Sequence, residues 1–326
     1  MLDDIILTGN NRSLLQQVIA RTRTEFAIKD LGRLNYFLGL EVSYTSNGLF
    51  IGQAKYAHDI LDRAQMLDCK LAATPLAAGT SLQSTGSSFG DPTLYRSLVG
   101  ALQYLTLTRP NLSFADNTVS QYLHSPTDEH FLAVKRILRY VKGTLHYGLH
   151  FTHHPKTSVV GYYDADWARC LETCRSTYSY SIFFGGNLVF WSAKKQPTVA
   201  RSSCESEYRA LANIGAEVVW LLNLLKELHQ SPTLPTTLFC DNRSAIFLGQ
   251  NPASHKRAKH IDIDCHFIRE LVSSGKLLTQ FVPSHLQFAN IFTKALPRPA
   301  FELLRSKLCV CSYPMQRLTG GIKGKS

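Results

Sequence analysis

The second half of the chain alternates between short apolar runs and segments whose apolar residues have helical spacing. The apolar runs predict strands at 158–164, 178–184, 188–193, 236–240 and 277–282. The helical spacing predicts helices at 202–228, from Asn242 onward, at 261–273 and at 288–296. Three strands, a long helix and then alternating strands and helices predict an α/β domain in which helices flank a mixed sheet.

The longest predicted helix, 202–228, has clear signals of its start and of its buried side. Ser202 and Glu205 have the spacing of a capping box at its first turn. Its apolar stripe consists of Leu211, Ile214, Val218, Leu221, Leu225 and Leu228. Glu207 lies four residues before Leu211, on the same side, so it faces the sheet. A carboxylate in that position costs free energy unless it is paired or binds a metal ion.

The first half predicts a smaller unit followed by several helices. Residues 12–26 have helical spacing, and the apolar runs on either side of Asn47-Gly48 predict a β-hairpin. Residues 70–92 are rich in Ala, Ser, Thr and Gly, which predicts an extended connection. Three further helices are expected after it, at 93–107, 113–123 and 126–142.

Three acidic residues stand where this order can bring them together. Asp164 ends one apolar run, Asp241 directly follows another, and Glu207 lies on the long helix. Two strand ends and a helix can place their carboxylates at one edge of a sheet, and hard oxygen ligands suit Mg²⁺. Two such ions held about 3.5–4 Å apart can promote phosphodiester hydrolysis. The pattern therefore predicts a nuclease-like metal site.

Composition and charge favour a polyanionic partner. The 35 Lys and Arg residues exceed the 24 Asp and Glu residues, which gives a formal net charge of +11. Such a balance favours nucleic acid through neutralisation of phosphates. No apolar run approaches the length of a membrane span, and the first residues lack the layout of a signal peptide. An intracellular location, in the cytoplasm or nucleus, is therefore expected.

The eight cysteines do not form a metal-binding pattern. They are scattered through the chain, and neither close pair has the Cys-x-x-Cys spacing of a zinc ribbon. Reduced thiols in a reducing compartment are the simplest expectation.

Short sequence motifs along nearly the whole chain resemble those of one family. YYDADWA, SSCESEY and FCDNRSA resemble the ribonuclease H domain of copia-type long-terminal-repeat retrotransposons. Further phrases of the same kind are WSAKKQPTVARSS, KHIDIDCHFIRE, FVPSHLQFANIFTKALP and, upstream, SLVGALQYLTLTRP. The resemblance implies a ribonuclease H-like mixed sheet at 151–300, preceded at 1–150 by the end of a reverse transcriptase: the end of its palm and its thumb and connection. Residues 301–326 are expected to form a basic, disordered tail.

The resemblance also implies roles for individual residues. It assigns metal binding to Asp164, Glu207 and Asp241, with two Mg²⁺ or Mn²⁺ ions and no small-molecule cofactor. His285 matches a loop histidine placed to shuttle a proton near the leaving group. Asn290 stands where the family has a fourth acidic residue, and it contributes no charge, so a second ion is held less favourably.

Basic residues near these words are candidates for gripping the phosphates of a hybrid by Coulombic attraction. They are Lys194, Lys195, Lys256, Arg257 and Lys259. At the start of the chain, Asp3 and Asp4 match the polymerase box of the family and are interpreted as remnants. Polymerase activity is not expected, because the third polymerase carboxylate and the fingers are missing.

Two hypotheses about function follow. The leading one is a ribonuclease that cuts the RNA strand of RNA–DNA hybrids, recognised by groove shape and 2′-hydroxyls. The alternative is a catalytically inactive, nucleic-acid-binding remnant, which Asn290 favours. An integrase is a poorer match, because in that class the Glu follows both Asp residues, whereas Glu207 lies between them.

Overall fold

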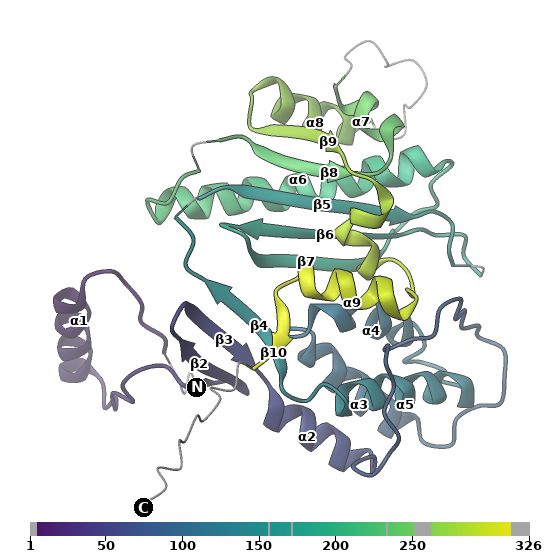
Figure 1. Ribbon diagram of the computed structural model, residues 1–326, viewed down its shortest axis with the longest axis horizontal. Helices are drawn as coiled ribbons and strands as arrows, with labels where there is room; N and C mark the ends of the chain where they lie inside the picture. The colour runs from purple at the N-terminus through teal and green to yellow at the C-terminus, as the bar shows by residue number, and fades with distance from the viewer. Residues whose placement is uncertain (1–4, 156, 171, 233, 251–261, 314–326) are drawn as a thin grey trace, which may run out of the picture.

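The computed structural model describes residues 5–155, 157–170, 172–232, 234–250 and 262–313 (Figure 1). Two five-stranded sheets organise this part of the chain, and the first of them also takes in a strand from the C-terminal segment. Helices α3 (Pro92–Leu105) and α5 (Asp128–Lys142) lie on the side of the first sheet, and α6 (Ser203–Glu227), α7 (Arg243–Gln250) and α8 (Asp262–Ser273) lie beside the second (Figure 1).

The second sheet carries the predicted ribonuclease H-like topology. Its strands lie in the order β7-β6-β5-β8-β9. They are β5 (Val159–Asp166), β6 (Thr177–Phe184), β7 (Asn187–Lys195), β8 (Thr236–Cys240) and β9 (Leu277–Phe281). The first three pair in antiparallel fashion, whereas β8 is parallel to both β5 and β9. The mixed sheet flanked by helices is therefore confirmed, and β5 lies at its centre.

The long helix α6 (Ser203–Glu227) covers one face of this sheet. Its start is capped by the Ser202 hydroxyl, which accepts a hydrogen bond from the Glu205 amide at 3.1 Å. In a capping box the Glu205 carboxylate would accept from the amide of Ser202, but here it accepts from the amide of Arg201, one residue earlier. At the sheet, a Cβ on Gly161 would lie 2.7 Å from Ile214 Cδ1, so this glycine permits the close approach of α6 to β5.

Two shorter helices complete the layer around α6. They are α7 (Arg243–Gln250) and α8 (Asp262–Ser273), and both contact α6. The Asn242 side chain accepts hydrogen bonds from the amides of Ser244 and Ala245, which caps α7. Within the described ranges, no helix is both long enough and apolar enough to cross a membrane.

The first sheet has the strand order β1-β2-β3-β4-β10. Its first four strands are β1 (Tyr36–Phe37), β2 (Leu40–Thr45), β3 (Gly48–Gly52) and β4 (Tyr147–Thr152). The hairpin predicted around Asn47-Gly48 joins β2 to β3. A Cβ on Gly48 would lie 1.9 Å from the Phe151 carbonyl oxygen, so the close approach of β4 requires glycine.

Five α-helices lie in the described part of the first half. They are α1 (Arg12–Glu25), α2 (Ala54–Arg63), α3 (Pro92–Leu105), α4 (Ser113–Ser120) and α5 (Asp128–Lys142). Helix α1 has no buried residue and lies apart from the other helices in Figure 1. Helix α5 begins with a capping box formed by Thr127 and His130.

The C-terminal segment returns to the first sheet instead of forming the expected tail. Residues 298–307 form α9 (Arg298–Lys307), and β10 (Val310–Ser312) pairs antiparallel with β4. The prediction of a disordered tail from residue 301 is therefore wrong for 301–312, while 314–326 lie outside the described residues. The reason is apolar burial: Phe301, Leu304, Leu308 and Val310 are each at most 4% exposed and belong to the core of the first half.

A buried cation lies beside α9. Arg109 is 1% exposed and donates to the backbone oxygen of Thr144 at 2.8 Å and to its hydroxyl at 2.5 Å. The Arg109 guanidinium lies 5.8 Å from the ring centroid of Tyr140 and 5.6 Å from that of Tyr147. Arg305 of α9 lies 4.8 Å from the Tyr147 ring, so this aromatic cluster connects α9 with α5 and β4.

The packing of α9 predicts a difference between two neighbouring leucines. Leu304 is 3% exposed and Leu303 is 47% exposed. We expect Leu304→Ala to lower the free energy of unfolding by about 2–5 kcal/mol, because it leaves a cavity in the core. The same truncation in Leu303→Ala should cost less than about 1 kcal/mol, and urea unfolding measures both. Equal losses would contradict the docking of α9.

A second prediction concerns Asp116 of α4, which is 6% exposed and whose Oδ1 has no hydrogen-bond partner among the described residues. Burial raises the pKa of this carboxyl to about 7. The folded chain therefore holds a proton between about pH 4 and pH 7 that the unfolded chain releases, so stability falls as pH rises through that window.

Asp116→Asn removes this pH-dependent loss. The effect of this substitution on the free energy of unfolding should therefore depend on pH. We expect it to be more stabilising at pH 8 than at pH 4.5 by on the order of 3 kcal/mol. Urea unfolding at the two pH values measures the difference, and the exposed Asp59→Asn serves as the control. An equal effect of Asp116→Asn at both pH values would contradict the prediction.

Candidate active site

The parallel pairing of β5 and β8 places two of the predicted acidic residues at one edge of the sheet. Asp164 lies near the end of β5 and is 3% exposed. Asp241 directly follows β8 and is half-buried. Because parallel strands end at the same edge, both carboxylates lie on that side of the sheet.

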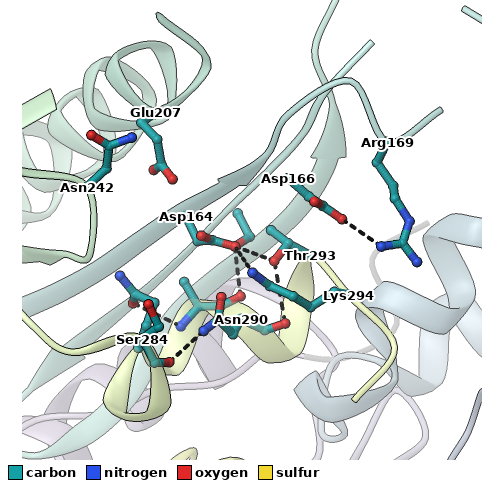
Figure 2. A network of polar contacts seen from close by, with 12 residues as sticks. Asp164, Asp166, Arg169, Glu207, Asn242, Ser284, Asn290, Thr293 and Lys294 are labelled. Atoms are coloured by element: carbon teal, nitrogen blue, oxygen red, sulfur yellow. Dashed lines mark hydrogen bonds and ion pairs between the residues drawn. The ribbon is translucent and has the colours of Figure 1, made fainter. Parts of the chain in front are cut away.

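Helix α6 contributes the third acidic residue. Glu207 is 5% exposed, and Figure 2 shows its carboxylate pointing toward Asp164. Ligand atoms of Glu207, Cys240 and Asp241 all lie within 4.8 Å of one another. The structure thus brings Glu207 and Asp241 together and adds a thiol, Cys240, which the sequence analysis did not consider part of a site.

Burial and neighbouring negative charge both act on Asp164 and Glu207. Burial, followed by the charges of Asp164 and Asp241, raises the pKa of Glu207 well above its ordinary value. Burial also raises the pKa of Asp164, and the charge of Asp241 adds to this effect. The cluster therefore carries more negative charge than its surroundings readily stabilise.

Two consecutive residues partly compensate the charge of Asp164. The Thr293 hydroxyl donates a hydrogen bond to Asp164 Oδ2, and Lys294 Nζ lies 3.6 Å from the same oxygen (Figure 2). Both contacts lower the pKa of Asp164, against the larger effect of burial. Neither contact is predicted by a local pattern in the sequence, and the one available signal is that both residues belong to the same family motif as Asn290.

Asn290 lies in the same segment, within η5 (Phe288–Phe292), and is 7% exposed. Its Nδ2 donates to the Ser284 backbone oxygen at 2.8 Å (Figure 2). Its Oδ1 has no hydrogen-bond partner among the described residues. A buried amide oxygen without a partner is costly, and it is a neutral oxygen ligand that a cation can use.

The η5 segment is fixed to the sheet by side chains next to Asn290. Gln287 is fully buried, and its Nε2 donates to the Tyr163 backbone oxygen at 3.0 Å. The Ser179 hydroxyl donates to the Ala289 backbone oxygen at 3.0 Å. These bonds hold η5 against β5 and β6. The predicted helix at 288–296 is thus a short 3₁₀ helix.

Of the remaining predicted site residues, His285, Lys194 and Lys195 are described, and the others lie outside the described residues. His285 is exposed on η4 (Ser284–Leu286). Lys194 is exposed at the end of β7, whereas the Lys195 ammonium donates to Gln121 and to Cys170. The other predicted residues, Lys256, Arg257, Lys259, Asp3 and Asp4, lie outside the described residues.

Asp166, the last residue of β5, forms an ion pair beside the cluster. Its Oδ2 lies 3.3 Å from Arg169 Nη1 (Figure 2). Burial raises the pKa of Asp166, and the charges of Arg169 and Lys294 oppose that shift. The charge of Asp166 is therefore compensated by the Arg169 side chain.

Comparisons with known proteins identify the family. Residues 1–78 match the family model described as reverse transcriptase (RNA-dependent DNA polymerase). The Pol polyprotein of transposon RE1 from Arabidopsis thaliana is 43% identical over 314 residues, which cover 96% of this chain and 21% of the polyprotein. An uncharacterized mitochondrial protein of the same plant is 49% identical over 219 residues, covering 67% of this chain and 91% of that protein.

The chain belongs to the copia-type retrotransposon Pol family. It spans about a fifth of the length of the Pol polyproteins that it matches. Among solved structures, LC11-RNase H1 in complex with an RNA/DNA hybrid has 12% sequence identity and a TM-score of 0.32, covering 41% of this chain and 93% of that chain. The ribonuclease H-like assignment therefore rests on the strand order β7-β6-β5-β8-β9 of this chain and not on that structural match.

The charge balance of the cluster predicts that Glu207 destabilises the metal-free protein. We expect Glu207→Gln to raise the free energy of unfolding at neutral pH by about 1–3 kcal/mol in a chelator, because it removes a buried, repelled charge. Chemical unfolding measures the change. Glu227→Gln, at the exposed end of the same helix, should change stability little. A loss of stability in Glu207→Gln comparable to a core truncation would contradict the prediction.

Proposed function

We propose that this chain hydrolyses the RNA strand of RNA–DNA hybrids at the cluster of Asp164, Glu207 and Asp241. The observation that carries the proposal is the approach of Glu207 from α6 to Asp241 after β8, within 4.8 Å, at the sheet edge where β5 places Asp164 (Figure 2). Buried carboxylates close to one another, on a chain with a net charge of +11, suit a metal-dependent reaction on a polyanion.

The residues fit a divalent cation. Glu207 and Asp241 supply carboxylate oxygens within 4.8 Å of each other, Asp164 lies at the same edge of the sheet, and the buried Asn290 Oδ1 has no hydrogen-bond partner among the described residues. Asp164, Glu207 and Asp241 would hold Mg²⁺ or Mn²⁺, with hard oxygen donors that both ions prefer. When bound, such ions lower the pKa of water and neutralise the charge that develops on the phosphate.

Other residues of the chain orient this set. Thr293 and Lys294 fix the rotamer of Asp164 through the contacts at its Oδ2. Asn290 Nδ2 donates to the Ser284 backbone oxygen, which ties the η5 segment to the turn that carries His285. His285 is exposed on that turn and is the candidate to donate a proton to the leaving oxygen.

Substrate recognition would be largely independent of base sequence. A hybrid presents phosphates and 2′-hydroxyls, which basic and polar side chains can contact without reading bases. Lys194 is exposed next to the end of β7 and remains a candidate for phosphate contact. Lys195 is less suited to this role, because its ammonium already has two partners.

A second candidate function is nucleic-acid binding without catalysis. It is favoured by the neutral side chain of Asn290 and by the Lys294 ammonium, which already lies 3.6 Å from Asp164. Both features reduce the negative charge available to a second divalent ion.

Cleavage of a labelled RNA–DNA hybrid in Mg²⁺ and in Mn²⁺ tests the proposal. We expect the native chain to cut the RNA strand, and Asp164→Asn to lower the rate by on the order of a hundredfold or more. Asn290→Asp should raise the rate, because a fourth charge strengthens the hold on cations. The exposed Glu227→Gln is the control.

The outcomes separate the two candidates. Cleavage that Asp164→Asn leaves unchanged would mean that another nuclease is present or that the site is elsewhere. No cleavage by the native chain or by Asn290→Asp, with binding of the hybrid retained in both, would support the non-catalytic function.

A further inference from the structure

Lys195 of β7 contacts Cys170 in the loop between β5 and β6, and a second cysteine, Cys174, lies in the same loop. The Lys195 ammonium donates a hydrogen bond to Cys170 Sγ at 2.9 Å. Cys170 is half-buried and Cys174 is exposed. Lys195 also donates to Gln121 Oε1 at 3.1 Å, which fixes the ammonium beside the thiol.

The surroundings of Cys170 stabilise a thiolate. Burial raises the pKa of this thiol, but hydrogen bonds from Lys195 and Thr173 outweigh it, so the pKa lies below its ordinary value. Burial raises the pKa of Cys204 and of Cys309, and no cation among the described residues opposes that shift. Partly exposed thiolates beside a lysine are the reactive class of protein cysteines.

The loop backbone brings the second cysteine close to the first. The Cys174 amide donates to the Cys170 backbone oxygen at 2.7 Å, and the Cys170 amide donates to the Arg175 backbone oxygen at 3.3 Å. These two bonds close a tight turn. A turn closed from residue i+4 back to residue i brings the two Cα atoms into the range of about 4.4–6.8 Å that a disulfide requires.

We propose that Cys170 is a nucleophilic thiol that hydroperoxides oxidise, and that Cys174 then resolves it as a disulfide. The Cys170 thiolate attacks a peroxide oxygen, the O–O bond breaks, and the leaving oxygen takes up a proton as water or alcohol. Cys170 is thereby oxidised to a sulfenic acid and the peroxide is reduced. The Cys174 thiol then attacks the Cys170 sulfur, the S–O bond breaks, and water leaves. The inference is independent of the proposed hydrolysis.

Alkylation rates test the nucleophile. The full chain is treated with limiting iodoacetamide at pH 7, and modification of each cysteine is followed by peptide mass spectrometry. We expect Cys170 to react about tenfold faster than Cys204, because its thiolate fraction is larger. Lys195→Met should slow Cys170 at least about threefold and leave Cys204 unchanged. The neighbouring, exposed Lys194→Met is the matched control.

Two results would overturn this step. One is a Cys170 rate no higher than that of Cys204 in the native chain, a comparison that needs no variant. The other is a Cys170 alkylation rate in Lys195→Met that equals the native rate. The Cys204 rate in the same sample, if it also equals the native rate, shows that the variant is folded.

Oxidation tests the disulfide. After one equivalent of hydrogen peroxide, we expect a peptide linked between Cys170 and Cys174. In Cys174→Ser, the sulfenic acid should persist on Cys170 and be trapped by dimedone. Peroxide that leaves Cys170 reduced, or that links Cys170 to another cysteine, would refute the proposal.

Discussion

The parallel pairing of β5 with β8 is the constraint on which the candidate site depends. It places the ends of the two strands, and with them Asp164 and Asp241, at one edge of the sheet. Helix α6 packs against β5 and delivers Glu207 to the same place. Like charges accumulate there at an energetic cost, which raises the pKa of both Asp164 and Glu207. Such a cost is typical of a site shaped to bind cations rather than to maximise stability.

The C-terminal segment connects this site to the first half of the chain. Between β9 and α9 it supplies Asn290, Thr293 and Lys294, which contact the site or its partners. Strand β10 then pairs with β4 in the first sheet. Because this single segment serves both sheets, the geometry around Asp164 depends on packing in the first half as well. The reverse-transcriptase-like and ribonuclease-like regions are therefore physically joined through β10 and α9.

Much of the second half could be predicted from the sequence, because its strands and helices have regular apolar patterns. The mixed sheet, the buried stripe of α6 from Leu211 to Leu225 and the approach of Glu207 to Asp241 follow from local periodicity and connection rules, whereas Leu228, predicted as the end of that stripe, lies past the helix end and is exposed. The return of β10 to β4 could not be predicted, since pairing with a strand far away leaves no local signal. Nor could the contacts of Thr293 and Lys294 with Asp164, which depend on where the Gln287 side chain anchors η5. The burial of Arg109 could not be predicted either, because its guanidinium contacts Thr144 and the rings of Tyr140 and Tyr147, which lie more than thirty residues away in the sequence.

The central claim is that the edge formed by β5, β8 and α6 binds divalent cations. Isothermal titration of the full chain with Mn²⁺ in the absence of nucleic acid tests this most directly. The account predicts saturable binding that is lost in Glu207→Gln and unchanged in Glu227→Gln on the exposed end of the same helix. Binding that is equal in the native chain and in Glu207→Gln, or no binding at millimolar Mn²⁺, would contradict it.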